Sequence, residues 1–199
     1  ILFSDTCDAG GGCAALGPNW TTSNGNLGGL GTLTSNSGGC SRFTRGGAVT
    51  NTSRVIDLSL KSSVDFSAWV RRGSDAFSEY PEGGENVVLE YLDTTGAWVA
   101  IQTFTGGGAA GQIFNVNTVL PPNVLHEDFQ IRFRQTAGSG GPPANGGSGW
   151  DHWHMDDVVL TDQTPAVSGL AVNVCDDFEA GFGNWFTTVP TNSGVNTQT

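Results

Sequence analysis

The chain has 199 residues and carries 8 Lys and Arg against 19 Asp and Glu, which gives a formal net charge of −11. This acidic balance, without a basic cluster, argues against nucleic acid or an anionic membrane surface as the main partner. No apolar run reaches the ~18 residues that a membrane-spanning helix needs, so no membrane insertion is predicted. The 30 glycines and the many Thr, Ser and Asn residues are typical of strands joined by turns rather than of helices.

Apolar and polar residues alternate with a period of two along most of the chain from residue 63 to residue 161. The strands predicted there are Ser63–Arg72, Glu85–Asp93, Gly96–Phe104, Gln112–Leu120, Glu127–Thr136 and His152–Thr161. Two earlier strand candidates, Cys40–Thr50 and Arg54–Leu60, are separated by residues 51–53. Because no segment shows a sustained helical stripe of apolar residues, the sequence predicts an all-β sandwich.

One strand and one turn show the expected chemistry most clearly. In Phe129–Arg134, aromatic or aliphatic residues alternate strictly with Gln and Arg, which predicts an antiparallel strand with one buried face. The segment Asp93–Gly96 is predicted to form a tight hairpin turn between two strands.

A short motif occurs near both ends of the chain and suggests how the chain is divided. Asp5 and Asp8 precede Asn19-Trp20, and Asp176 and Glu179 precede Asn184-Trp185 in the same order. We therefore expect a domain over residues 1–161, a linker over 162–174 and a separate segment over 175–199.

The final segment, of about 25 residues, is too short to bury a core of its own. It either begins a second repeat or is a strand-exchange tail that pairs with the exposed sheet edge of a neighbouring copy. The residues expected to serve such assembly are Asp176, Phe178 and Trp185.

The four cysteines, Cys7, Cys13, Cys40 and Cys175, form no C-x-x-C pair. In an acidic chain with a single lysine, their even number favours disulfides in an oxidising compartment over four buried thiols. Three pairings are possible; Cys7–Cys13 together with Cys40–Cys175 is favoured only slightly, because the sequence does not determine connectivity.

Several motifs in order resemble the MAM-type jelly-roll domain, in particular that of bacterial surface and pilus-associated proteins of the MshQ type. They are the opening acidic and Asn-Trp element, Arg45-Gly46-Gly47, the stretch from Arg72 to Tyr91, and Trp153–Val158. The resemblance covers residues 1–161 and implies an antiparallel jelly-roll β-sandwich of the MAM or concanavalin-like kind. It implies an extracellular, cell-surface and non-catalytic role in adhesion or assembly, in some members with a structural calcium ion. The cysteine positions depart from those of animal MAM domains, so their disulfide scheme is not carried over.

Calcium needs several oxygen ligands brought close together, and acidic residues recur at the first strand, in the central loop and in the last strand. The candidate calcium ligands are Asp5, Asp8, Asp75, Glu85 and Asp157. If Trp153 faces inward, alternation places Asp157 inward too and Asp156 outward. Arg132 or Arg134 is then the expected ion-pair partner of Asp156, and the other acidic residues also fit a solvated turn.

Aromatic residues could bind sugars on such a sandwich, although most tryptophans in this fold belong to the core. The candidate ligand residues are Trp150, Trp153 and His154, with Trp98 and Tyr80 as further aromatic candidates. His152 and His154 share a strand face, but a third zinc ligand at a recognisable spacing is missing.

The sequence thus favours a non-enzymatic, extracellular structural or adhesive module, a subunit or repeat of a surface appendage or filament. Its partners would be neighbouring copies of itself through strand contacts, with a carbohydrate-binding adhesin domain as the alternative. A hydrolase is disfavoured, because no nucleophile-elbow or phosphate-loop motif occurs.

Overall fold

A computed structural model describes residues 1–6, 19–22, 29–31, 35–37, 41–73, 79–138, 151–164, 186–188 and 195–197. The chain divides into two compact units, Ile1–Pro165 and Ala166–Thr199. In the second unit, β12 (Phe186–Thr188) pairs with β13 (Val195–Thr197) in antiparallel orientation. The described part of the chain contains no helix long and apolar enough to cross a membrane.

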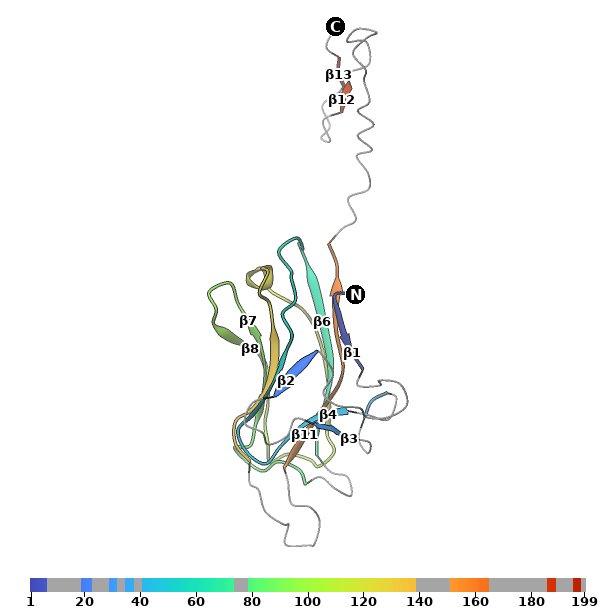
Figure 1. Cartoon of the computed structure of the whole chain (residues 1–199). Coiled ribbons are helices and arrows are strands. Elements are labelled where there is room, and N and C mark those ends of the chain that lie inside the picture. Colours follow the sequence, from blue (N-terminus) through green and yellow to red (C-terminus); the bar gives the residue numbers. More distant parts are fainter. Residues whose placement is uncertain are drawn as a thin grey trace. The chain divides into compact units, whose positions relative to one another are not determined.

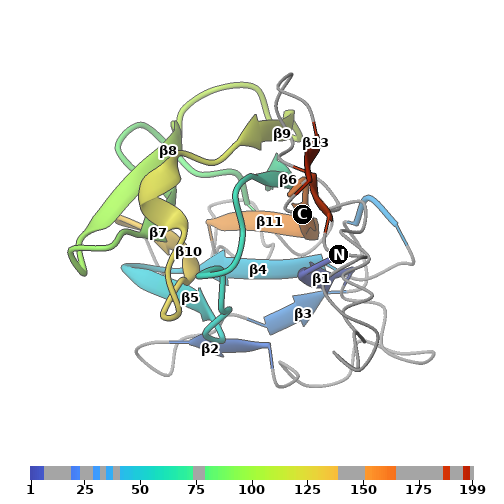
Figure 2. The same ribbon diagram turned by 90° about the horizontal axis from the view of Figure 1, so that it is seen from above.

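The first unit is a jelly-roll sandwich of two antiparallel sheets that face each other (Figures 1 and 2). The strands of the five-stranded sheet are, in order, β2 (Trp20–Thr22), β5 (Val49–Ser53), β10 (Ile131–Gln135), β7 (Val87–Leu92) and β8 (Trp98–Phe104). Those of the six-stranded sheet are β3 (Gly29–Gly31), β4 (Ser41–Arg45), β11 (His152–Asp162), β6 (Val64–Arg72) and β9 (Ile113–Val119), with β1 (Phe3–Asp5) added beside β11. A short 3-10 helix, η1 (Pro122–Val124), lies before β10.

The predicted all-β sandwich is confirmed, and six predicted strands correspond to β6, β7, β8, β9, β10 and β11. The predicted burial of Phe129, Ile131 and Phe133 is also confirmed, since all three are fully buried. The predicted turn at Asp93–Gly96 forms as expected: the Asp93 carboxylate accepts hydrogen bonds from the Thr95 and Ala97 backbone N–H groups, and Gly96 has a positive φ of 79°.

Around residue 50 the strand prediction is wrong. Residues 51–53, expected to separate two strands, lie inside β5, and 54–60 form no strand beyond a single bridge at Ile56. The polar residues Asn51 and Ser53 face the core because neighbouring strands satisfy them. Thr22 donates a hydrogen bond to Asn51 Oδ1 over 2.7 Å, and Ser53 Oγ accepts one from the Ile131 N–H over 3.0 Å.

The space between the sheets is filled by large aromatic and aliphatic side chains, of which Trp153, Phe3, Phe66, Phe104, Phe129 and Phe133 are the largest that are fully buried. Charged residues are buried as well, among them Arg72. Arg72, only 2% exposed, directs its guanidinium to the backbone oxygens of Thr105 and Ala109 and to Gln112 Oε1, and lies 5.5 Å from the Trp153 ring centre. Burial lowers the pKa of Arg72, but the carbonyl dipoles and aromatic faces replace its hydration.

Candidate functional site

The outer face of the five-stranded sheet presents an ordered array of polar and aromatic side chains. Alternation along β10 sends Arg132 and Arg134 outward while their neighbours enter the core. Strand register then aligns the outward residues in rows across the sheet. One row contains Thr21, Thr52, Arg132, Glu90 and Ala100. The next row contains Thr50, Arg134, Val88 and Thr103.

Glu90 holds both arginines of this face in place. Its Oε1 accepts a hydrogen bond from Arg134 Nη2 over 2.7 Å, and its Oε2 accepts bonds from Arg134 Nε over 3.0 Å and from Arg132 Nε over 2.6 Å. Burial alone raises the pKa of Glu90, but the hydrogen bonds and positive charge of Arg134 and Arg132 outweigh it, so that its pKa lies below the usual value. Glu90 is therefore a fixed carboxylate at neutral pH.

Trp98, at the start of β8, completes this group. The Arg132 guanidinium carbon lies 4.1 Å from the centre of the half-buried Trp98 ring, within cation–π distance. Glu90 and Trp98 together restrict the long Arg132 side chain to one position. We call Glu90, Trp98, Arg132 and Arg134 the Arg–Trp cluster.

The Arg–Trp cluster offers unengaged hydrogen-bond donors on the outer face of the sheet, where the Arg132 and Arg134 side chains are partly exposed. Only the Nε of Arg132, and the Nε and Nη2 of Arg134, are engaged by Glu90. The remaining terminal nitrogens, Arg132 Nη1 and Nη2 and Arg134 Nη1, have no hydrogen-bond acceptor among the described residues. A few fixed polar groups beside an aromatic ring are what a site for a polar ligand such as a sugar requires.

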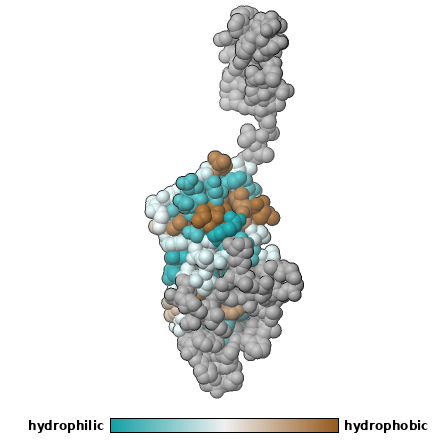
Figure 3. Space-filling view, in the orientation of Figure 1, coloured by the Kyte–Doolittle hydropathy of each residue, from teal (hydrophilic) through white to brown (hydrophobic). Residues whose placement is uncertain are grey.

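An apolar surface patch is a weaker candidate site. Figure 3 shows one face of the first unit, on which hydrophobic residues form small clusters between hydrophilic ones. The exposed large apolar side chains include Ile1, Val55 and Leu60, and exposure of a few such side chains is ordinary for a folded domain.

The sequence suggested part of the Arg–Trp cluster, since alternation placed both arginines outward and Trp98 was one of the aromatic candidates. Their shared partner was predicted incorrectly: Glu90, and not Asp156, binds Arg132 and Arg134. Glu90 lies on β7, about 40 residues earlier in the chain, and only the pairing of β7 with β10 brings it beside them.

The predicted sugar-binding residues occupy different places. Trp153 is fully buried and donates its Nε1 hydrogen to the Glu85 backbone oxygen over 2.9 Å, so its ring has no face open to a ligand. His154 is 3% exposed, and its ring lies 5.7 Å from that of His152 in a stacked arrangement. Trp150 lies outside the described residues.

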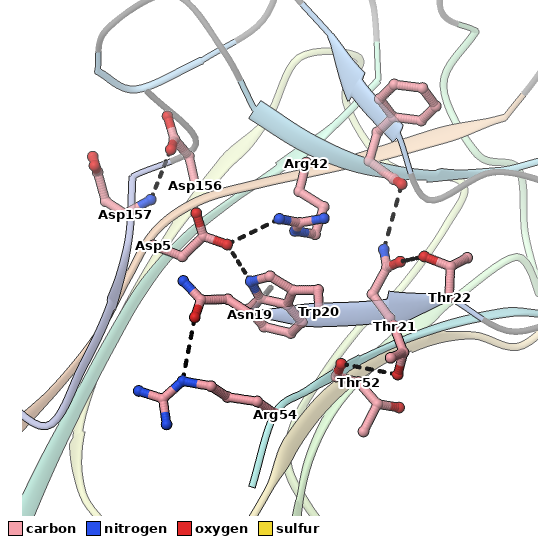
Figure 4. Close-up of polar contacts among 12 residues, drawn as sticks. Asp5, Asn19, Trp20, Thr21, Thr22, Arg42, Thr52, Arg54, Asp156 and Asp157 are labelled. Atoms are coloured by element: carbon pink, nitrogen blue, oxygen red, sulfur yellow. Dashed lines mark hydrogen bonds and ion pairs between the residues drawn. The ribbon is translucent and has the colours of Figure 1, made fainter. Parts of the chain in front are cut away.

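Among the described residues, the predicted calcium ligands Asp5, Glu85 and Asp157 are not brought together as one set. Asp5 binds Arg42 over 2.9 Å and accepts a hydrogen bond from Trp20 Nε1, a contact visible in Figure 4. Both carboxylate oxygens of Asp157 accept hydrogen bonds, from the Asn36 amide and the Ser37 hydroxyl. Oxygens engaged by a guanidinium or by N–H and O–H donors do not suit a cation, and Asp8 and Asp75 lie outside the described residues.

Glu85 lies elsewhere, in the group of described carboxylates that is best placed for a metal ion. The carboxylate oxygens of Glu82, Glu85 and Asp151 lie within 4.8 Å of one another. Burial, followed by the negative charges of Asp151, Glu85 and Glu79, raises the pKa of Glu82, as expected for like charges held together. A bound cation would relieve this repulsion, and calcium binding stays a prediction.

The expected inward orientation of Asp157 is wrong, whereas Asp156 lies on the face of β11 opposite to the core residues Trp153 and Met155, as expected. A register shift in β11 between Asp156 and Val159, with a positive φ of 48° at Asp157, moves the core-facing series to Val158 and Leu160 and leaves Asp157 partly exposed. Asp156 is nevertheless fully buried. The Asp156 Oδ2 accepts backbone hydrogen bonds from Asn36 over 2.8 Å and Ser37 over 3.1 Å, and its Oδ1 accepts one from Asp157 over 2.8 Å. Burial nevertheless raises its pKa to about 6.

This raised pKa predicts an unusual pH dependence of stability. Between about pH 4 and pH 6 the folded protein retains a proton on Asp156 that the unfolded chain has lost, so the free energy of unfolding falls as the pH rises. Two pKa units correspond to roughly 3 kcal/mol at most. We expect urea titrations across this range to show this fall in wild type and to lose it in Asp156→Asn.

Asp162→Asn is the matched control. The hydrogen bond from Lys61 lowers the pKa of Asp162 to about 2. The stability that this ionised carboxylate contributes is therefore lost only as the pH falls below about 4, so Asp162→Asn should keep the wild-type slope between pH 4 and pH 6. An Asp156→Asn profile with the wild-type slope between pH 4 and 6 would contradict the assignment.

The cysteines Cys7, Cys13, Cys40 and Cys175 and the proposed assembly residues Asp176, Phe178 and Trp185 all lie outside the described residues. Disulfide formation and assembly through the tail therefore stay predictions. So does the proposed domain division at residues 161 and 175, beside the observed division at Pro165.

No protein-family model and no curated protein sequence matches the chain. Solved structures do. A family 22 xylan-binding domain from Paenibacillus barcinonensis Xyn10C has a TM-score of 0.53 at 12% identity, covering 83% of this chain and 96% of its own. The C-terminal family 22 carbohydrate-binding module of Clostridium thermocellum Xyn10B has a TM-score of 0.52 at 16% identity, covering 80% and 92%. A cleaved adhesin domain of Lys-gingipain from Porphyromonas gingivalis has a TM-score of 0.51 at 12% identity, covering 80% and 97%.

At these identities the similarity concerns the fold, and it agrees with the jelly-roll part of the family resemblance. The narrower identification as a MAM-like domain of the MshQ type stays a prediction. The chain thus has the jelly-roll sandwich fold that is shared by carbohydrate-binding modules and an adhesin domain.

Proposed function

We propose that the first unit is a non-catalytic carbohydrate-binding module, which takes a polysaccharide on the outer face of its five-stranded sheet. The observation that carries the proposal is the Arg–Trp cluster, in which Trp98 and Glu90 hold the partly exposed Arg132 side chain over the ring and leave its terminal nitrogens without an acceptor among the described residues. Sugar rings present apolar C–H faces and neighbouring hydroxyls, which suit an aromatic ring beside fixed hydrogen-bond donors. Two structural neighbours with this fold are named as xylan-binding or carbohydrate-binding domains.

The chemistry of this face favours binding over hydrolysis. A glycosidase needs two carboxyl groups on either side of the bond that it cleaves, one of them protonated. Among the described outward residues of the five-stranded sheet, Glu90 is the only acidic one. Its lowered pKa keeps it ionised, so the protonated carboxyl group that a glycosidase needs is not found among them. An extracellular location is part of the proposal, because polysaccharides of this kind occur outside cells.

Affinity electrophoresis in gels containing xylan, mixed-linkage glucan, galactan or polygalacturonate tests the proposal. We expect at least one polymer to retard the wild-type protein. Trp98→Ala should weaken this binding by roughly 10- to 100-fold, because it removes the aromatic face and frees the Arg132 side chain.

Tyr80→Ala is the control, since Tyr80 is a similarly accessible aromatic residue, 43% exposed, outside the Arg–Trp cluster. It should bind as wild type does. The proposal would be wrong if no polymer retarded the wild-type protein, or if Trp98→Ala, with an unchanged melting temperature, bound as tightly as wild type.

A further inference from the structure

We infer that the polysaccharide taken by the Arg–Trp cluster carries carboxylates, as uronic-acid sugars do; this inference rests on the function proposed above. The first argument is local charge. Two guanidinium groups share the single carboxylate of Glu90, so the cluster keeps one positive charge in a chain whose net charge is −11. A site for a neutral sugar gains nothing from this excess.

Other described cations have different surroundings. Lys61 pairs with Asp162 over 2.7 Å, and Arg42 pairs with Asp5 over 2.9 Å. Arg72 is buried within the core, and Arg54 donates hydrogen bonds to the neutral oxygens of Asn19 and Val55. The two arginines that share one carboxylate lie on the outer sheet face, where the side chains of Arg132 and Arg134 remain 20% and 36% exposed.

The second argument is geometry. Glu90 uses the Nε of Arg132, which leaves its two terminal nitrogens as a planar pair without an acceptor among the described residues. Such a pair matches the two oxygens of a carboxylate in a bidentate hydrogen bond, a stronger interaction than one with a hydroxyl. The Trp98 ring beneath the guanidinium keeps the pair in position before the ligand binds.

The net negative charge of the chain does not prevent this recognition. At physiological ionic strength, exposed charges are screened beyond about 8 Å, so a ligand carboxylate at Arg132 responds mainly to its immediate surroundings. Among the described outward residues of this sheet the nearby carboxylate is Glu90, which both arginines already neutralise.

The test compares acidic polymers with their own neutral forms. Glucuronoxylan, polygalacturonate and alginate are each measured by isothermal titration before and after chemical reduction of their carboxyl groups. We expect the wild-type protein to bind at least one acidic polymer about tenfold more tightly than its reduced form, and NaCl to diminish this preference. In Arg132→Gln and Arg134→Gln the ratio of the two affinities should fall towards one. Arg54→Gln, at an exposed arginine outside the cluster, should keep the wild-type ratio.

Each outcome decides the inference. Equal or tighter binding of the reduced polymers by wild type overturns the inference and leaves the proposed function standing. Binding of none of the polymers, acidic or neutral, overturns both. A wild-type preference for the acidic polymer that persists in folded Arg132→Gln and Arg134→Gln also overturns the inference, because the carboxylate is then recognised elsewhere. Melting curves show which variants are folded, and each arginine is tested separately.

Discussion

Replacing Arg72 by Met is expected to lower the free energy of unfolding by about 3 kcal/mol or more. Arg72 donates hydrogen bonds to the backbone oxygens of Thr105 and Ala109 and to the side chain of Gln112, and all of these lie in the connection between β8 and β9. Methionine fills much of the same volume but donates nothing, so the hydrogen bonds by which the buried guanidinium holds this connection are lost. Chemical denaturation followed by tryptophan fluorescence measures the loss.

Arg54→Gln is the matched control for this loss. Arg54 is exposed and bonds to Asn19 and to the Val55 backbone oxygen, so its replacement should change stability by less than about 1 kcal/mol. If Arg72→Met were as stable as wild type, the guanidinium would not be holding the loop, and the buried hydrogen bonds would have no energetic importance.

Gly106→Ala is expected to destabilise the fold by about 3 kcal/mol, although it adds one methyl group. A Cβ at Gly106 would overlap the backbone oxygen of Glu82 and lie 2.9 Å from its carbonyl carbon, and neither of these atoms can turn aside as a side chain would. The Gly106 N–H also bonds to Asn86 Oδ1 over 3.0 Å, so the loop is attached at the site of the clash. The melting temperature should fall accordingly.

Gly83→Ala lies in the neighbouring turn and provides the comparison. A Cβ there meets nothing within 4 Å and the backbone does not require a positive φ, so the change should be within about 0.5 kcal/mol. Equal stability of the two alanine variants would show that the contact between the two loops is not a tight one.

Prediction from sequence succeeded where hydrophobic alternation was strong and local. The segment of Phe129, Ile131 and Phe133 became a strand with one buried face, because burying these side chains dominates its energetics. Prediction failed at Asn51 and Ser53, which were expected to separate two strands but lie inside β5. Partners on β2 and β10 satisfy them inside the sandwich, and no local pattern reveals such partners.

The candidate site was also predictable from the sequence only in part. Alternation put Arg132 and Arg134 outward, but the sequence did not reveal that Glu90 joins them or that Trp98 lies beneath Arg132, because strand order and register determine both contacts. Trp153, one of the candidate ligand residues, is a core residue. Alternation along a strand shows which side chains share a face, but it does not show which of the two faces is covered by the opposite sheet.

By itself the sequence determined that the protein is built from antiparallel strands, where most of these lie and which of their faces are apolar, since the energy of burying alternate side chains is a local property. The tertiary structure alone decided which polar groups meet: the carboxylate between two arginines, the buried Arg72 among carbonyl oxygens and the buried Asp156 carboxylate at the N–H groups of Asn36 and Ser37. Electrostatic and hydrogen-bond energies depend on distances between residues far apart in the chain, and those distances exist only after the sheets have paired and packed.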